Sequence, residues 1–451
     1  MIPAISASYI YSKLGNSNSL VPMAIKDIAN SVGLTAGSYI TGDELEGKDR
    51  FLDEFGTQAI WLFGIPAYKK LLDFTLYKAL KIDPNFDVRN FSKKRKKLIN
   101  KTINYADSSI KESIINATKN PKFSKNLAMG KFVVSTALTI LSYAGLTKYR
   151  HLQTKKAAQK EILKEMQLEN KDNKDKFLYT KPANKAAFNG LHQNKNQDQP
   201  AFTGGISEFM YNPVKNLMIL DGSITAERLA ESRNKQELAG YAIKEGSFWA
   251  FMYFASKPIQ KFLENRAEKN TQKPVAIDLD ARVIESEDLA KAFKDGSLVK
   301  SSEKVLKLNS YNSMLDYIHN NPDDFVVKMA KMSDIIPTLK KATQADDVDY
   351  RQFIDYDEFQ GVASKLKKLS QKFENFKATD IKDKSIEAFL KNVKKAKRSS
   401  IILNIGACIG ALGVLAPALM VAMRKFDKNN EGFQVKEDLK QEMLASGKIQ
   451  G

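Results

Sequence analysis

The chain has 451 residues, enough for two or three domains, and 71 lysines and arginines against 52 aspartates and glutamates give it a net charge of +19. With 27% charged residues and a negative mean hydropathy, it is not built mostly from membrane-spanning helices. One cysteine, Cys408, excludes an intramolecular disulfide, and three widely spaced histidines (His151, His192 and His319) exclude a cysteine–histidine metal site.

The first apolar segment, residues 55–80, follows a short helical pattern near the N-terminus, which itself lacks the pattern of a secretory signal. The uncharged part of this segment, Phe55 to Tyr68, is too short to cross a bilayer alone. Trp61 favours a membrane interface, and Gly64 and Pro66 interrupt the helical pattern. We therefore expect an interfacial segment or, alternatively, part of a substrate site.

A dense basic run follows the first apolar segment and begins a predicted amphipathic helix, residues 95–118. Positive charges near a membrane attract anionic lipid by about 1 kcal/mol per charge. The same charges could hold nucleic acid phosphates, but no helix-turn-helix, RRM, KH or zinc-finger pattern accompanies them. Lipid or a protein partner is favoured over nucleic acid, and a solvated helix face is equally compatible with the run Lys93, Lys94, Arg95, Lys96 and Lys97.

The second apolar segment, residues 132–147, has sixteen uncharged positions between Lys131 and Lys148. It can cross a bilayer if the lysine stems reach outward along the hydrocarbon. A charged helical pattern continues to residue 169. Residues 170–204 are rich in Asn, Lys, Asp and Gln, which predicts a flexible polar linker.

After this linker the order of the first part recurs. Residues 222–229 (GSITAERL) resemble 37–45, residues 245–264 resemble 54–73, and IDLDAR (277–282) resembles 82–89. The apolar segment after the linker, residues 246–264, carries Trp249 and Pro258 where the first apolar segment, residues 55–80, carries Trp61 and Pro66. We therefore predict a divergent tandem duplication, with a first copy at 1–169 and a second that starts at 205–284.

An inserted segment, residues 285–375, is predicted to be a soluble helical module, with Gly296 near the end of a helix, Ser310 as a helix cap and Pro322 near the start of another. Acidic residues in its second half have the spacing of a degenerate calcium loop: Asp347, Asp349, Asp355 and Glu358. Arg351 and Gln352 stand where such a loop needs a ligand oxygen and a glycine. An acidic helix–loop surface is the favoured interpretation.

A carboxylate pair precedes this module. Asp278 and Asp280 occupy alternate positions, so they could hold a divalent metal or act in acid–base chemistry. No third ligand accompanies them. A structural turn, or a salt bridge from Asp280 to Arg282, is favoured.

The most apolar stretch is residues 399–423, which contains no charged side chain. We predict an amphipathic helix within 376–428, with Ile386, Phe389, Leu390 and Val393 on one face, that continues into a transmembrane helix over this stretch. The small residues Gly406, Gly410 and Gly413 favour close helix packing or self-association. A buried helix of a soluble protein is the alternative, and residues 429–451 form a polar tail.

No sequence motif indicates an enzyme or a cofactor site: Walker A, Rossmann, GxSxG and HExxH patterns are absent. The sequence predicts a mainly α-helical membrane-associated protein with a structural or interaction role. A transporter is the alternative, with Gly64, Pro66, Gly246 and Pro258 near its site. Against it, residues 399–423 lack the charge that ion pathways usually carry. An enzyme or nucleic-acid-binding module in 285–375, tethered by the membrane helix, is a third hypothesis.

Overall fold

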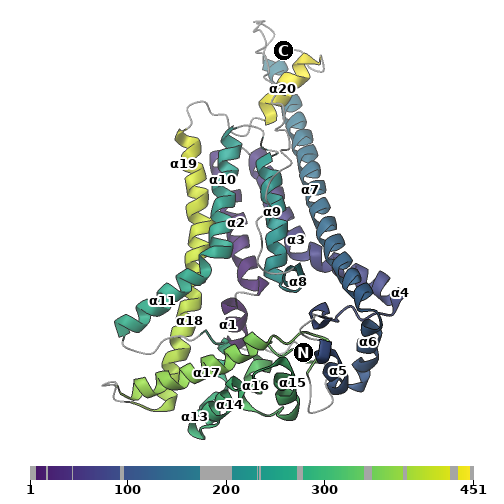
Figure 1. The fold of residues 1–451 in the computed structure, drawn as a ribbon. Helices are drawn as coiled ribbons and strands as arrows, with labels where there is room; N and C mark the ends of the chain where they lie inside the picture. Colours follow the sequence, from purple (N-terminus) through teal and green to yellow (C-terminus); the bar gives the residue numbers. More distant parts are fainter. Residues whose placement is uncertain are drawn as a thin grey trace, which may run out of the picture.

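The fold is mainly helical, as the sequence predicts (Figure 1). The computed structural model describes residues 7–16, 19–42, 44–91, 96–172, 206–230, 232, 235–271, 278–339, 348–378, 383–426 and 435–446. Within these ranges there is no β-strand, only an isolated bridge between Thr338 and Val348. The helical content by itself tests neither the predicted membrane association nor the predicted tandem duplication.

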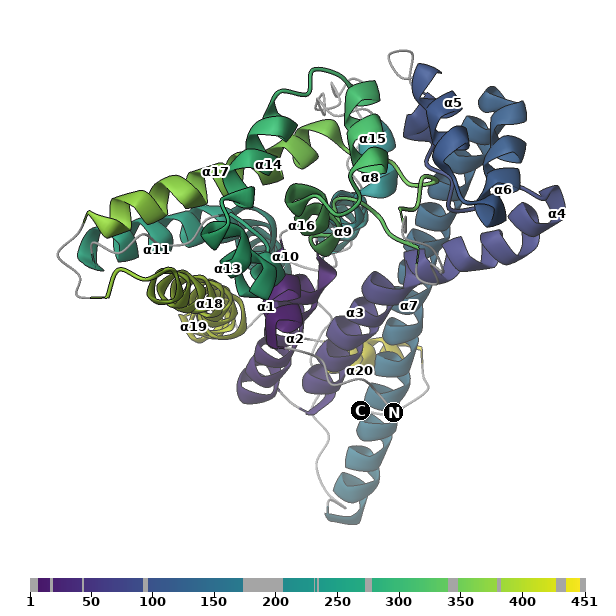
Figure 2. The ribbon, with the colours of Figure 1, turned by 90° about the horizontal axis from the view of Figure 1, so that it is seen from below.

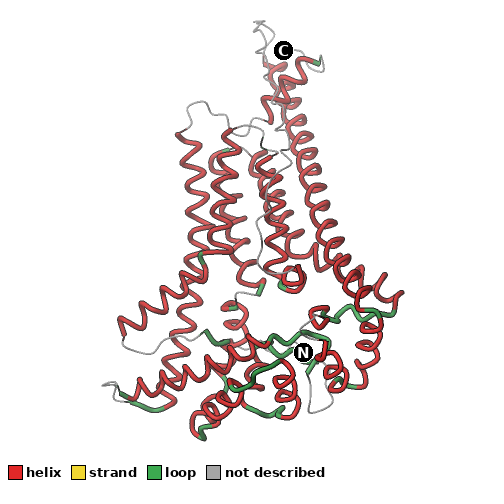
Figure 3. Tube along the Cα trace, viewed as in Figure 1, coloured by secondary structure: helices red, strands yellow, loops and turns green. Residues whose placement is uncertain are grey.

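The upper part of the molecule is a bundle of long helices that stand side by side (Figures 1 and 3). One column consists of a helix, a π-helical turn and a second helix that continue one another, as the sequence predicts for 386–423. The chain ascends in α2, α7, α9 and this column, and descends in α3 and α10 (Figure 1). The helices of the bundle are α2 (Leu20–Thr41), α3 (Glu44–Leu72), α7 (Pro121–Asp172), α9 (Pro213–Ala230), α10 (Lys235–Trp249), and the column α18 (Ile386–Gly410), η5 (Ala411–Leu415) and α19 (Ala416–Phe426).

Shorter helices lie at the lower end of the bundle. The predicted helix over 95–118 is in fact two helices: the first ends at Tyr105, and the carbonyl of Asp107 accepts from Ile110 and Lys111 in the first turn of the second. The elements below or beside the bundle are α1 (Ala7–Gly15), η1 (Asp73–Tyr77), α4 (Lys78–Leu80), η2 (Val88–Phe91), α5 (Lys96–Tyr105), α6 (Ser108–Lys119), α8 (Ile206–Tyr211), η4 (Ala250–Phe254) and α11 (Ser256–Thr271).

Residues 285–375, which the sequence analysis treats as an insertion, belong to a compact helical module, seen from below in Figure 2. Its core extends beyond 285–375, since it takes in Leu279 and, from α18, Phe389, Leu390 and Val393. Ser310 caps α15 as predicted. The helices of the module are α12 (Ala281–Glu285), α13 (Glu287–Lys294), α14 (Ser297–Leu306), α15 (Tyr311–Asn320), α16 (Phe325–Met332) and α17 (Tyr356–Lys377).

The region described from sequence only as a polar tail contains helix α20 (Val435–Ala445). Its Leu439 and Met443 pack on Ala158 and Ile162 of α7. The predicted linker 170–204 begins inside α7, and from residue 173 onward it lies outside the described residues.

Among the described residues, two helices are long and apolar enough to cross a membrane: Pro121–Met166 and Ile386–Met423. Only 28% and 22% of their most apolar windows are buried, so neither resembles the core helix of a soluble protein. Large apolar side chains also face outward from other bundle helices, such as Val32 of α2 and Phe63 of α3. In the described part of the module, by contrast, Leu306 is the one large apolar side chain exposed. The bundle therefore has an apolar exterior and the module a sealed core.

Helix α2 packs closely on the candidate span at a pair of glycines. A Cβ added to Gly33 would lie 2.1 Å from the carbonyl oxygen of Gly413. Gly406 and Gly410 would meet nothing within 4 Å. Of the three glycines named from sequence, Gly413 thus makes a close contact within the chain, while the other two face outward.

We expect Gly33→Ala to destabilise the bundle by about 1–3 kcal/mol, because the added methyl group must push two backbones apart. Gly406→Ala is the matched control and should be neutral or slightly stabilising, since it only improves helix propensity. Thermal unfolding of both variants in the same detergent measures the difference. Equal melting temperatures would contradict the close packing of α2 on η5.

Three Asp-x-Arg turns lie where the bundle meets the lower helices. In each, the arginine donates from its backbone N–H and its guanidinium to the aspartate two residues earlier. The predicted Asp280–Arg282 salt bridge is confirmed, with 3.0 Å between Oδ2 and Nη2. The turns are Asp87–Arg89, Asp280–Arg282 and Asp349–Arg351.

Two of these arginines also join separate parts of the chain. Arg351 reaches Asp83 at 3.0 Å, and Arg282 reaches Asp334 at 2.9 Å. Lys13 of α1 binds the same Asp334 carboxylate at 3.2 Å. Partial burial alone would raise the pKa of Asp334, but its hydrogen bonds with Arg282 and Lys13 and their positive charges hold it below its ordinary value.

Candidate functional site: a charged interior in the helical bundle

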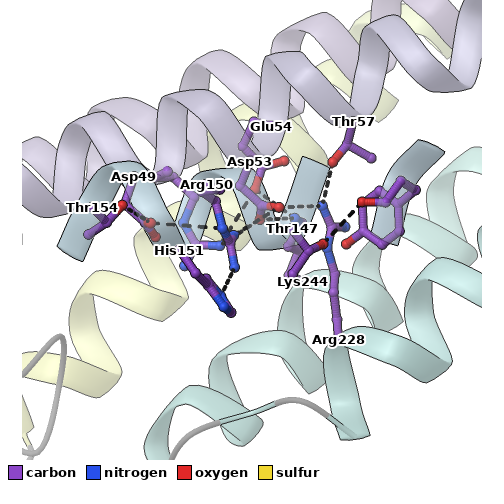
Figure 4. Close-up of polar contacts among 12 residues, drawn as sticks. Asp49, Asp53, Glu54, Thr57, Thr147, Arg150, His151, Thr154, Arg228 and Lys244 are labelled. Atoms are coloured by element: carbon purple, nitrogen blue, oxygen red, sulfur yellow. Dashed lines mark hydrogen bonds and ion pairs between the residues drawn. The ribbon is translucent and has the colours of Figure 1, made fainter. Parts of the chain in front are cut away.

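The first half of α3 carries a charged face that points into the bundle. Asp49, Arg50, Asp53 and Glu54 follow the three- and four-residue spacing of a single helix face. In a surface helix this face would be in water, but here α7, α9 and α10 cover it (Figure 4). Both Asp53 and Glu54 are buried.

Asp53 is the centre of the cluster, in contact with cations from four helices. Its Oδ1 lies 2.9 Å from Arg150 Nη1 of α7 and 3.4 Å from Arg228 Nη2 of α9. Its Oδ2 lies 3.9 Å from Lys244 Nζ of α10 and 3.7 Å from Arg50 Nη1 of α3. One carboxylate thus holds together four positively charged side chains.

Two further carboxylates complete the inner part of the cluster. Glu54 accepts from Lys244 at 2.6 Å, and Glu245 accepts from Arg228 at 2.7 Å. Arg228 also donates to the Thr57 hydroxyl at 3.3 Å (Figure 4). Helices α3 and α7 from the first part of the chain and α9 and α10 from the second part therefore contribute to one network.

The network continues toward the upper end of the bundle through α7. Arg150 Nε lies 3.8 Å from Asp49, which also accepts from the Thr154 hydroxyl at 2.6 Å. The other side of the Arg150 guanidinium lies 3.0 Å from His151 Nε2. A cavity of about 210 Å³, lined in part by Asp49, His151 and Thr154, lies at this end, where α20 meets α7.

The charges of this network balance. The carboxylates of Asp49, Asp53, Glu54 and Glu245 face the cations of Arg50, Arg150, Arg228 and Lys244. A buried charge loses several kcal/mol of hydration, so each ion is tolerable only because its partners are present. Such a network adds little net stability over an apolar core, which leaves its retention to be explained by function or specificity.

A small polar cavity of about 30 Å³ adjoins the network. It can hold a water molecule or an ion of similar size. Asp27 of α2 and Asp221 of α9 line it in addition to Glu54, Lys244 and Arg228, so acidic groups predominate around it. The Gln58 side chain also lines it, and its amide nitrogen is buried without a hydrogen-bond partner among the described residues.

Some of the residues selected from sequence lie at this cavity, and others do not. Trp61 is buried and lines it, so its ring is inside the bundle and not at a surface. Trp249 donates to the Thr225 hydroxyl at 3.0 Å, close to Glu245. Gly64 instead faces α7, Pro66 lies within an uninterrupted α3, and Pro258 is exposed at the start of α11.

The other candidate residues have separate locations. Asp349 is paired with Arg351, and Asp355 caps α17 by accepting from the backbone of Asp357 and Glu358. Asp347 lies outside the described residues, as do Lys93, Lys94 and Arg95, while only the backbone of Lys96 and Lys97 is described. In the described ranges, no group of three metal-ligating side chains is brought together.

The burial of these charges could not be recognised from the sequence. A helix face with alternating acids and bases is typical of a solvated surface, and nothing local distinguishes it from an interior one. One available indication was that Glu54 and Glu245 take the same place in the two resembling segments. No family model matches this chain, and no curated protein or solved structure is significantly similar to it.

Proposed function

We propose that the bundle is embedded in a membrane and provides a pathway for a small ion. The observation that carries this proposal is the charged network inside a bundle whose outer surface is apolar. A soluble protein has the opposite arrangement. Ionisable residues at membrane depth are costly and characteristically belong to substrate or ion pathways.

An anchoring role alone would not need this interior. An anchor requires one apolar helix, and charges inside its bundle would only add a desolvation penalty. The absence of charge in residues 399–423 was the sequence-based objection to transport, because ion pathways usually contain a charged residue. That objection loses weight, since Asp53, Arg228 and Lys244 come from other helices of the same bundle.

We also propose that the two halves are divergent copies. Glu54 and Glu245, which correspond in the resembling segments, both bind the central cations. The corresponding Asp87–Arg89 and Asp280–Arg282 pairs form turns with the same hydrogen bonds. A site built from equivalent helices of two repeats is a recurrent architecture of transporters.

The test is ion flux into liposomes that contain the purified full chain. A pH-sensitive dye reports proton flux, and parallel assays follow Na⁺, K⁺ and Cl⁻. The double variant Glu54→Gln/Lys244→Met removes one acid and one base, so the charge balance survives. We expect its flux to fall at least about tenfold, because the inner cavity loses one negative and one positive charge.

A matched control is Lys294→Met/Glu387→Gln, which removes an exposed ion pair at 2.6 Å in the lower module, away from the network and its cavities. It should leave flux unchanged. If the full chain conducts none of the four ions above the level of empty liposomes, or if the inner double variant conducts normally, the proposal is wrong.

The second candidate is a membrane-anchored interaction protein, with the lower module as the part that meets a partner. The sealed core of the module and its continuous connection to the candidate span through α18 favour it. Absence of flux in a correctly inserted chain would leave this candidate as the better one.

A further inference from the structure

A third cavity lies at the lower end of the bundle, apart from the charged network. Its volume is about 270 Å³, close to the lower limit of small-molecule sites. Residues from α2, η4, α11 and α18 line it, so distant parts of the chain meet there. Phe254 and Lys257 are exposed beside it and form its mouth.

The charged side chains that line this cavity in the described part of the chain are all positive. Lys26, Lys215 and Lys257 line it, together with the amides of Asn404 and Gln260, and none of the described lining residues is acidic. Its cations and amide N–H groups are the donors that bind phosphate and carboxylate.

Lys26 is the decisive residue, because it is only 2% exposed. Its amine contacts the carbonyl oxygen of Phe251 at 3.4 Å, and within the described part of the chain no carboxylate lies within ion-pair distance. The adjacent Asp27 lines the small inner cavity instead. A buried ammonium with a single carbonyl contact is costly unless an anion accompanies it.

The remaining lining is apolar. Met23, Met218 and Met252 provide flexible, polarizable surface that adapts to an alkyl group. At the mouth, the Phe254 side chain is 59% exposed, so apolar surface continues from the cavity to the outside of the molecule. A ligand with a charged head and an apolar portion would match both parts.

We propose that this cavity binds an anionic amphiphile through a phosphate or carboxylate head group, with Lys26 as the buried contact and Lys257 at the mouth. The ligand belongs to the class of acidic lipids, with which it shares the chemistry of a free phosphate ion. This inference does not depend on transport, since the cavity and the charged network use different side chains.

The experiment measures binding to the full chain in an uncharged detergent. The probes are dioctanoyl phosphatidic acid, dioctanoyl phosphatidylcholine of the same chain length, and inorganic phosphate. Lys26→Met and Lys257→Met remove the proposed contacts. The control is Lys261→Met, which removes an exposed lysine of the same helix α11 that does not line the cavity.

We expect phosphatidic acid to bind, and Lys26→Met to weaken it about tenfold or more while Lys261→Met changes it less than twofold. Inorganic phosphate that binds with the same dependence on Lys26 would support the site with a free anion as its ligand. Phosphate that fails to bind would support the lipid as the source.

The proposal would be overturned by equal binding of phosphatidylcholine, or by a folded Lys26→Met variant with undiminished affinity. Because Lys26→Met removes a buried charge, we expect its melting temperature to be at or above that of the wild type. Should it nevertheless fail to fold, Lys257→Met decides the question, since an exposed residue at the mouth can be changed without disturbing the core. Undiminished affinity in that variant would then count against the site.

Discussion

Asp53→Asn is expected to destabilise the bundle by about 3–5 kcal/mol. Asparagine has nearly the same shape, so packing is preserved and the loss is electrostatic. Arg150 and Arg228 then lose the negative charge of the carboxylate that they contact at 2.9 and 3.4 Å, and Lys244 loses the same charge at 3.9 Å. Three buried cations are left facing fewer anions. Denaturation of the purified chain in detergent measures the loss.

A matched control on the same helix is Glu44→Gln. Glu44 pairs with Lys48 at the surface, its side chain is 72% exposed, and its substitution should leave the free energy of unfolding unchanged within error. Adding Arg150→Met to Asp53→Asn should recover part of the lost stability, because it removes one of the uncompensated cations. If Asp53→Asn stays within about 1 kcal/mol of the wild type, the network is hydrated and not a desolvated core.

Phe389→Ala is expected to destabilise the lower module by about 3–5 kcal/mol. The Phe389 ring is fully buried, and its centre lies 5.2 Å from the Phe373 ring, 5.5 Å from Phe376 and 6.0 Å from Phe293. Truncation leaves a cavity between α13, α17 and α18. Hydrogen exchange should quicken in α13 and α17, while the protection of α3 and α7 stays unchanged.

The control for this prediction is Leu306→Ala, at the exposed apolar position of the same module. It should cost less than about 1 kcal/mol, since little apolar surface is removed from the core. Quickened exchange throughout the bundle in Phe389→Ala would mean that the module and the bundle unfold as one unit, contrary to the separate cores described above.

Local pattern was enough to predict much of the fold. The face formed by Ile386, Phe389, Leu390 and Val393 is confirmed, because it repeats with the helical period and nothing in the segment breaks the helix. The Asp280–Arg282 pair is also confirmed, since a two-residue spacing lets one side chain close on its own turn. These features depend on neighbours in sequence.

The features that could not be predicted depend on distant neighbours. Asp53 has cations from α7, α9 and α10 around it, and no spacing within α3 reveals them. Gly413 contacts α2 while Gly406 faces outward, although the two lie two turns apart on the same apolar helix. Which face of such a helix meets a partner is set by the rest of the fold.

The ascent of both candidate spans in the same direction has a consequence for how the chain could be inserted. Between them in the chain, α9 ascends and α10 descends (Figure 1), and α10 carries the buried side chains of Lys244 and Glu245. An isolated helix with two such charges is costly to place in hydrocarbon. If both spans cross one bilayer, the insertion of α10 has to be coupled to its pairing with Glu54 of α3 and Arg228 of α9, whose charges compensate its own.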